Sequence, residues 1–173
     1  MKVFTAKKIS ALAVMTALLV VGKLALTMIP NVEVVSLFCA VFGYVFGFIA
    51  AIPTLIFTLI LGAYWGFNTW VITYIIHFTA ISVVFALLSK KNIDKPYIVA
   101  PIIAVQTFVF GLIDAFLVTV IGGADGFLYR FTVYYGNGIV FVLIHICSNF
   151  VIFLMLFKPL ATLTKRLTDK LKI

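Results

Sequence analysis

Six polar side chains lie inside long apolar runs of this sequence, and their chemistry is the first guide to function. An ionisable side chain in hydrocarbon costs roughly 2.5 to 3.5 kcal/mol, so such groups usually face a bundle interior or a binding pathway. The six residues are Lys23, His77, Gln106, Asp114, His145 and Asn149. Their charged and hydrogen-bonding groups could bind a polar molecule, or they could pair with one another and hold helices together.

Helical spacing gathers most of these residues onto three faces. The faces consist of Trp70, Tyr74 and His77; of Thr107, Gly111 and Asp114; and of Asn137, Phe141, His145 and Asn149. If the three faces converge, they form a cup with aromatic walls and a few hydrogen-bonding groups, which suits a small, flat, polar molecule. The structural alternative is that Asp114 pairs with Lys23 or a histidine and pins the bundle.

Composition places these faces in membrane-spanning helices. Of the 173 residues, 65% are hydrophobic and 10% are charged, and the mean hydropathy is +1.27. Soluble domains carry about a quarter charged residues, whereas runs of roughly 18 or more apolar residues mark helices that cross a bilayer. The sequence therefore predicts an all-α integral membrane protein embedded in a lipid bilayer, and it excludes a soluble enzyme domain, a fibrous repeat and a disordered chain.

Eleven of the 13 basic residues, which give the chain a net charge of +8, fall into three clusters, and Lys23 and Arg130 lie elsewhere. The clusters are Lys2, Lys7 and Lys8; Lys90, Lys91 and Lys95; and Lys158, Lys165, Arg166, Lys170 and Lys172. Short loops rich in Lys and Arg stay on the cytoplasmic side of a membrane. The charge therefore indicates orientation and not a nucleic-acid surface, and both termini are expected in the cytoplasm.

Three clusters on one side require an even number of crossings between successive clusters, and six helices satisfy this requirement. The expected helices cover residues about 9–29, 34–49, 53–64, 70–88, 97–121 and 135–157, in a single membrane domain over residues 1–173 with a basic cytoplasmic tail at 158–173. A five-helix count, which fuses the second and third helices, would place Lys90 outside. The first apolar run exceeds the about 7 to 15 residues of a signal-peptide core, so we expect it to be a helix of the membrane domain.

The three loops predicted on the outer side carry many of the remaining polar and aromatic residues. They include Asn31, Glu33, Tyr64, Trp65, Asn68, Asp125, Arg130, Tyr134 and Tyr135. Trp and Tyr also form the interfacial belt of membrane proteins whatever their function. The rim therefore fits either a pocket that opens to the outside or the belt alone.

Catalytic and metal-binding signatures are not found in the sequence. It contains no HExxH, GxSxG or P-loop motif, and its two histidines have no third ligand at a supporting spacing. Cys39 and Cys147 form no CxxC pair and are interpreted as buried thiols. We therefore expect no enzyme, no metal and no cofactor of its own, and ATP-driven transport would need partner subunits.

Small side chains form a stripe along the first helix, at Ala6, Ser10, Ala13 and Ala17. Such stripes let two membrane helices approach closely, because close packing replaces the hydrophobic drive that is absent in lipid. The stripe could contact a partner subunit, and an internal packing seam would look the same.

These features together resemble the substrate-binding S components of energy-coupling-factor (ECF) transporters, membrane proteins that capture vitamins for prokaryotic uptake. The resemblance covers about six helices in under 200 residues, the Ala13-x-x-x-Ala17 motif, the segment IPNVEVVSLF from Ile29 to Phe38, the following GYVFGFIAA, and YGNGIVFVLIHICSNFVIFLMLFKPL from Tyr135 to Leu160. It implies a multi-pass protein of the prokaryotic cell membrane.

The resemblance also implies a mechanism. A vitamin or vitamin precursor would bind from outside, under a lid at Asn31 and Glu33, in a cup built by the last three helices. The protein would then associate with a transmembrane coupling subunit and two ATPase subunits, with Ala13 and Ala17 at the docking surface. ATP would be used only by those partners.

The candidate substrate-binding residues combine this lid with the faces and the rim. They are Asn31, Glu33, Trp65, Asn68, Trp70, Tyr74, His77, Asp114, Arg130, Tyr135, Asn137, His145 and Asn149. The substrate stays open between a planar heterocyclic vitamin and cobalamin. Two other classes also stay open: a stand-alone membrane facilitator or channel, and an intramembrane enzyme that would use His77, His145 and Asp114.

Overall fold

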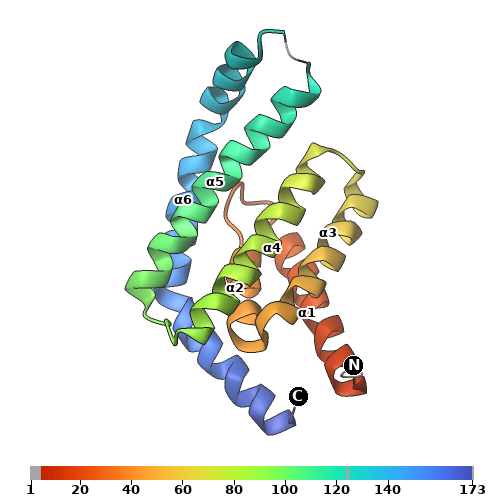
Figure 1. The fold of residues 1–173 in the computed structure, drawn as a ribbon, viewed down its shortest axis with the longest axis vertical. Coiled ribbons are helices and arrows are strands. Elements are labelled where there is room, and N and C mark those ends of the chain that lie inside the picture. The colour runs from red at the N-terminus through yellow and green to blue at the C-terminus, as the bar shows by residue number, and fades with distance from the viewer. Residues whose placement is uncertain (1–4, 124, 173) are drawn as a thin grey trace.

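The computed structural model describes residues 5–123 and 125–172, so Lys2 of the first basic cluster lies outside the described residues. All elements in these two ranges are helical, which confirms the all-α prediction. They are α1 (Ala6–Ala25), α2 (Val35–Phe46), the 3-10 turn η1 (Gly47–Ala50), α3 (Ala51–Trp65), α4 (Thr69–Lys90), α5 (Pro96–Ile121) and α6 (Phe127–Leu171). Figure 1 shows them as an elongated bundle with both termini at the same end.

Five helical stretches are long and apolar enough to cross a membrane: α1, the stretch Val35–Trp65, α4, α5 and α6. These stretches are those of a multi-pass membrane protein. The stretch Val35–Trp65 is not one straight rod, because Gly47 adopts φ +71° and ends α2. Glycine reaches this left-handed region without steric cost. The chain reverses there, and α3 runs back beside α4 (Figure 1).

The last helix is longer than predicted. It begins at Phe127 and ends at Leu171, so residues 127–134, the expected helix 135–157 and residues 158–171 of the expected basic tail form one helix of 45 residues. Arg130 and Tyr134, expected in a loop, lie in its first turns. The helix extends past its apolar part because Leu, Lys, Arg and Ala are good helix formers, and the apolar run alone marks only the part that suits lipid.

The first helix also differs from its expected bounds of 9–29. It begins at Ala6, where the Thr5 hydroxyl accepts a hydrogen bond from the Lys8 backbone amide, and it ends at Ala25. Residues 26–34 then form the α1–α2 loop. The bounds of α4 and α5 lie within two residues of the prediction, because Asn68 is a good N-cap residue and Pro96 suits the first turn of a helix.

The core lies where α2, α4 and α6 meet. Phe85 contacts both Phe153 and Phe157, with ring centroids 5.6 and 5.1 Å apart, and all three rings are fully buried. One turn earlier on α4, the Ser82 hydroxyl donates a hydrogen bond to the Cys39 carbonyl oxygen at 3.1 Å. These contacts bring the backbone of α2 unusually close to α4 at Gly43 and Ser82.

Replacing Gly43 with alanine should destabilise the bundle. A Cβ at this position would lie 2.8 Å from Ser82 Cα and closer still to the Ser82 carbonyl oxygen, so the two helices would have to move apart. Overpacking of this kind typically costs about 1 to 3 kcal/mol. A thermal-unfolding measurement in detergent should show a lower midpoint, whereas Gly136→Ala, where a Cβ meets nothing within 4 Å, should leave the midpoint unchanged or raised.

Candidate functional site

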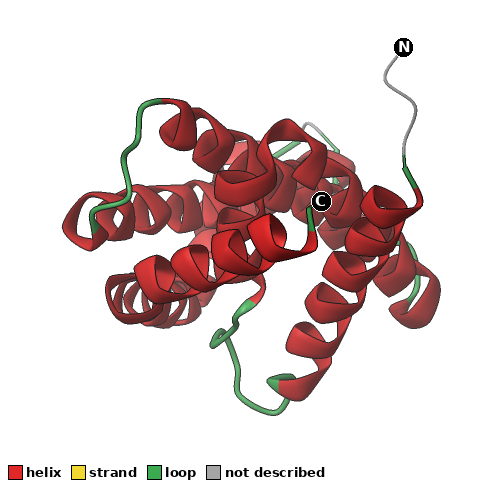
Figure 2. Ribbon diagram, turned by 90° about the horizontal axis from the view of Figure 1, so that it is seen from below, coloured by secondary structure: helices red, strands yellow, loops and turns green. Residues whose placement is uncertain are grey.

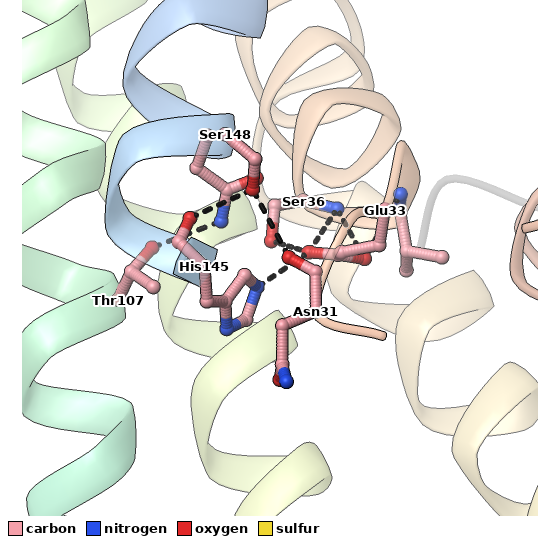
Figure 3. Close-up of polar contacts among 8 residues, drawn as sticks. Asn31, Glu33, Ser36, Thr107, His145 and Ser148 are labelled. Carbon is pink, nitrogen blue, oxygen red and sulfur yellow. Dashed lines mark hydrogen bonds and ion pairs between the residues drawn. The ribbon is translucent and has the colours of Figure 1, made fainter. Parts of the chain in front are cut away.

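The α1–α2 loop is fixed to the bundle by the carboxylate of Glu33 (Figure 3). Its oxygens accept hydrogen bonds from the backbone amides of Val35, at 3.1 Å, and of Ser36, at 3.3 Å, and from the Ser36 hydroxyl. The same carboxylate therefore occupies the N-terminus of α2, where the helix dipole favours negative charge. Glu33 is buried, although it lies outside the helices.

Glu33 also reaches α6. His145 Nε2 lies 3.3 Å from Glu33 Oε1, and both side chains are buried. Burial alone would raise the pKa of the Glu33 carboxyl, but the hydrogen bond and charge of His145, the Ser36 hydrogen bond and the charge of Lys23 outweigh it and lower this pKa to about 2. Glu33 is therefore a carboxylate at neutral pH.

Asn31 makes the second contact between the loop and α6. Its backbone carbonyl accepts a hydrogen bond from the Ser148 hydroxyl at 3.0 Å. Asn31 adopts φ +58°, a conformation that asparagine tolerates better than most residues. Figure 3 shows its side-chain amide turned away from the Glu33 carboxylate. At Asn31 the loop is therefore held through its backbone carbonyl, and the side-chain amide of this residue is available for other contacts.

One cavity, of about 380 Å³, lies between α5 and α6, and we call it the α5–α6 cavity. Its lining includes Thr107, Phe110, Asp114, Tyr134, Tyr135, Asn137 and His145. The Asp114 carboxylate accepts hydrogen bonds from Tyr134, at 2.9 Å, and from Thr73, at 3.1 Å. The Tyr135 hydroxyl is buried and has no hydrogen-bond partner within the described chain, so it can bond to a molecule in the cavity.

A second cavity, of about 290 Å³, lies under the α1–α2 loop, and we call it the loop cavity. It is lined by loop residues and by Lys23, Glu33, Trp65, Tyr74, Phe78 and His145. The Lys23 ammonium group lies 5.3 Å from the centre of the Tyr74 ring, within the range of a cation–π contact. The loop cavity therefore combines aromatic walls with one cationic and one anionic side chain.

Three residues line both cavities: Asn31, Phe110 and His145. They come from the loop, α5 and α6, and they form the wall between the two spaces. The Phe110 and His145 rings contact edge to face, with centroids 5.6 Å apart. The two spaces differ in charge, because Asp114 lines the α5–α6 cavity and Lys23 lines the loop cavity.

Several predicted residues are thus brought together at the two cavities. Asn31 and His145 line both, Glu33, Trp65 and Tyr74 line the loop cavity, and Asp114, Tyr135 and Asn137 line the α5–α6 cavity. Asp114 pairs with neither Lys23 nor a histidine, which were the partners that the structural alternative named. Its hydrogen-bond partners come from α4 and α6, so it does also connect those helices.

Other predicted residues do not line the cavities. Asn68 caps α4 and accepts a hydrogen bond from the Thr69 hydroxyl at 3.0 Å. Trp70 packs between Trp65 and Tyr74, and Arg130 donates to the Gly123 carbonyl. His77 is buried against Phe110, at 4.7 Å between ring centroids. Asn149 is buried and donates to Thr107 at 3.0 Å. None of these five lines either cavity.

Sequence reasoning did not select Phe110, Tyr134 or Lys23 as site residues. Phe110 carries no polar signal and is one of 18 phenylalanines, so nothing in the sequence distinguishes it. Tyr134 stood out only as a rim residue, and Lys23 only as an isolated charge in an apolar run. That apolar run ends near the α1–α2 loop. The position of Lys23, one turn before this loop, is the feature of the sequence that could have identified it as a site residue.

The small-residue stripe of α1 faces outward. All four of its residues are exposed, so they are not an internal packing seam: Ala6, Ser10, Ala13 and Ala17.

Within residues 5–123 and 125–172, no group of three or more His, Cys, Asp or Glu side chains could hold a metal ion.

Comparisons of the chain with protein-family models, curated proteins and solved structures give no match. The chemistry of the two cavities and of the contacts that close the loop over them is therefore the basis for a functional proposal.

Proposed function

We propose that this chain is the substrate-binding membrane subunit of an ECF-type importer, with six crossings and both termini in the cytoplasm. The observation that carries the proposal is the buried contact between Glu33 and His145, which holds the α1–α2 loop over two cavities with polar linings. A loop fixed by a buried ionic hydrogen bond above a polar cavity suits a lid that closes over a captured molecule.

The position of the cavities supports uptake from outside. They lie toward the end of the bundle opposite the two termini, and the three basic clusters mark the terminal end as cytoplasmic. A ligand would therefore enter from the external side. Delivery inward would use a coupling subunit and two ATPase subunits, with the exposed stripe of α1 at the docking surface.

The size and lining of the site favour a planar heterocyclic vitamin or precursor over cobalamin. Small-molecule sites occupy roughly 300 to 1,000 Å³, and the α5–α6 cavity, at about 380 Å³, lies at the lower end of that range. Aromatic side chains on both sides of the dividing wall suit a flat ring. Asp114 and Lys23 suit polar groups at its two ends.

Native mass spectrometry of the gently purified protein tests this proposal. A small heterocycle that co-purifies with the chain, together with the ATPase subunits, would support it. Binding is then measured from intrinsic fluorescence, because both tryptophans of the chain, Trp65 and Trp70, lie at or beside the loop cavity. Ligand flux through vesicles without ATP or partners would instead indicate a stand-alone facilitator.

Replacing Asp114 with alanine should weaken ligand binding by about 1 to 3 kcal/mol, because a half-buried charged acceptor in the lining of the α5–α6 cavity is removed. Tyr134→Phe is the matched control, since it removes a hydroxyl bonded to the same carboxylate and leaves the carboxylate in place. Fluorescence titration should show a large loss of affinity for the first variant and a smaller one for the second. Unchanged affinity with a lower unfolding temperature would make Asp114 a structural residue only.

A further inference from the structure

An apolar groove lies at the opposite end of the molecule from the two cavities, between α1 and the last turns of α6. Its volume is about 610 Å³, and its walls include Val14, Leu18, Phe42, Phe46, Leu167 and Leu171. Figure 2, viewed from the end that holds the termini, shows α1 standing at the edge of the bundle beside the end of α6. No described part of the chain fills this groove.

One basic side chain lines the groove, and several others lie on the same end of α1 and α6. Lys7 lines it, and the Lys7 ammonium group donates to the Leu171 carbonyl oxygen at 3.0 Å, which joins α1 to the end of α6. Lys8 lines a smaller cavity on the other side of α1. Lys165, Arg166, Lys170 and Lys172 are exposed on the last turns of α6.

Negative charge is scarce at this end. Among the described residues, the acidic side chains there are Asp169 and Asp94, and the Asp94 carboxylate lies 3.4 Å from Lys158. The groove therefore has an apolar interior, with Lys7 in its lining and Lys172 next to its lining residue Leu171. It opens at the level where the apolar residues of α1 and α6 give way to charged ones, which corresponds to the headgroup level of a bilayer.

We propose that this groove binds an anionic phospholipid, with an acyl chain along the apolar walls and the phosphate near Lys7 and Lys172. Charge complementarity selects this occupant, because clusters of four to eight basic residues beside a membrane-spanning helix attract anionic lipid headgroups. A neutral detergent or a zwitterionic lipid could occupy the apolar groove, but it would bring no net negative charge to the nearby lysines. The groove shares no lining residue with the two cavities, but Ala6 and Ser10 of the α1 stripe line it, so a bound lipid and a docked coupling subunit would compete for this part of α1.

Lipid titration followed by native mass spectrometry tests the proposal on the full chain in a neutral detergent. Phosphatidylglycerol should bind at least tenfold more tightly than phosphatidylcholine of the same chain length. The double variant Lys7→Gln, Lys172→Gln should lose most of this preference, since one lysine near an anionic headgroup is worth about fivefold in affinity. Val14 lines the groove and its side chain is exposed, so the larger ring of a Val14→Trp variant should occupy the groove and weaken the binding of both lipids.

The matched control is Lys91→Gln, Lys95→Gln, which removes the same charge from the α4–α5 loop at the same end of the molecule. This control should bind phosphatidylglycerol as the unmodified chain does. Equal losses in the two double variants would overturn the proposal in favour of general surface charge. Equal binding of the two lipids, or a dimer that forms through the groove and excludes lipid, would overturn it as well.

Discussion

Replacing Glu33 with alanine should cost about 3 to 5 kcal/mol of the free energy that holds the α1–α2 loop closed, the usual penalty for removing one partner of a buried ionic pair. The variant leaves His145 without its buried partner and leaves the Val35 and Ser36 amides at the start of α2 without an acceptor. If a closed loop is needed to retain ligand, the dissociation rate should rise by at least a hundredfold.

Stopped-flow fluorescence of ligand release measures this effect. Glu33→Gln should be intermediate, because a neutral amide can still accept hydrogen bonds from the backbone of α2. Asp125→Ala is the matched control, since Asp125 is an exposed acidic residue in the α5–α6 loop. Equal release rates for the Glu33→Ala variant and the unmodified protein would show that the loop does not retain ligand.

Acid should open the loop over a defined range. The pKa of Glu33 is lowered from 4.5 to about 2, so its contribution to stability is fully present above pH 4.5 and is lost as the pH falls toward 2. Ligand release should therefore accelerate below pH 4.5 in the unmodified protein. The Glu33→Gln variant should lack this acceleration, which separates the titration of Glu33 from general acid unfolding.

Replacing Ala13 with tryptophan should reduce ATP-dependent transport at least a hundredfold and leave ligand affinity within about twofold, if the stripe of α1 docks a coupling subunit. Ala13 is exposed, so the large ring has space in the isolated protein and obstructs only a closely packed helix. The two cavities lie toward the other end of the bundle and should be unaffected.

Transport is measured in vesicles that contain the coupling subunit and both ATPases, and binding is measured on the isolated chain. Val105→Trp, at an exposed position of α5, is the control for a bulky ring on a lipid-facing surface. It should transport normally. Full transport by the Ala13→Trp variant would contradict the docking assignment, and equal loss in both variants would indicate a general effect on membrane insertion.

Much of the fold could be predicted because composition and caps specify it locally. The apolar runs identify α4 and α5, and Asn68 and Pro96 fix where they begin. The end of α6 could not be predicted in this way. The residues after Phe157 leave the apolar pattern but keep helix-forming side chains, and apolarity reports only what suits lipid.

The site was predictable only in part, because periodicity defines a face but not the direction in which it points. His145, Asp114 and Asn137 did reach the cavities, whereas His77 turned toward Phe110 and became buried in ring contacts. The direction in which His77 points depends on the rotation of α4 about its axis. That rotation is set by tertiary contacts, among them the close approach of Gly43 on α2 to Ser82 on α4.

The length of α6 has a mechanical consequence. Helix α6 carries His145 and Ser148, which hold the loop, and, beyond Pro159, also Leu167 and Leu171, which line the apolar groove. At 1.5 Å per residue, Leu171 lies about 39 Å along the axis from His145. A tilt of one degree about His145 would move Leu171 by roughly 0.7 Å. A small rotation at the loop contacts is thus amplified at the apolar groove, and Pro159, which removes one backbone hydrogen bond of α6, is the point at which the helix can bend and absorb part of it.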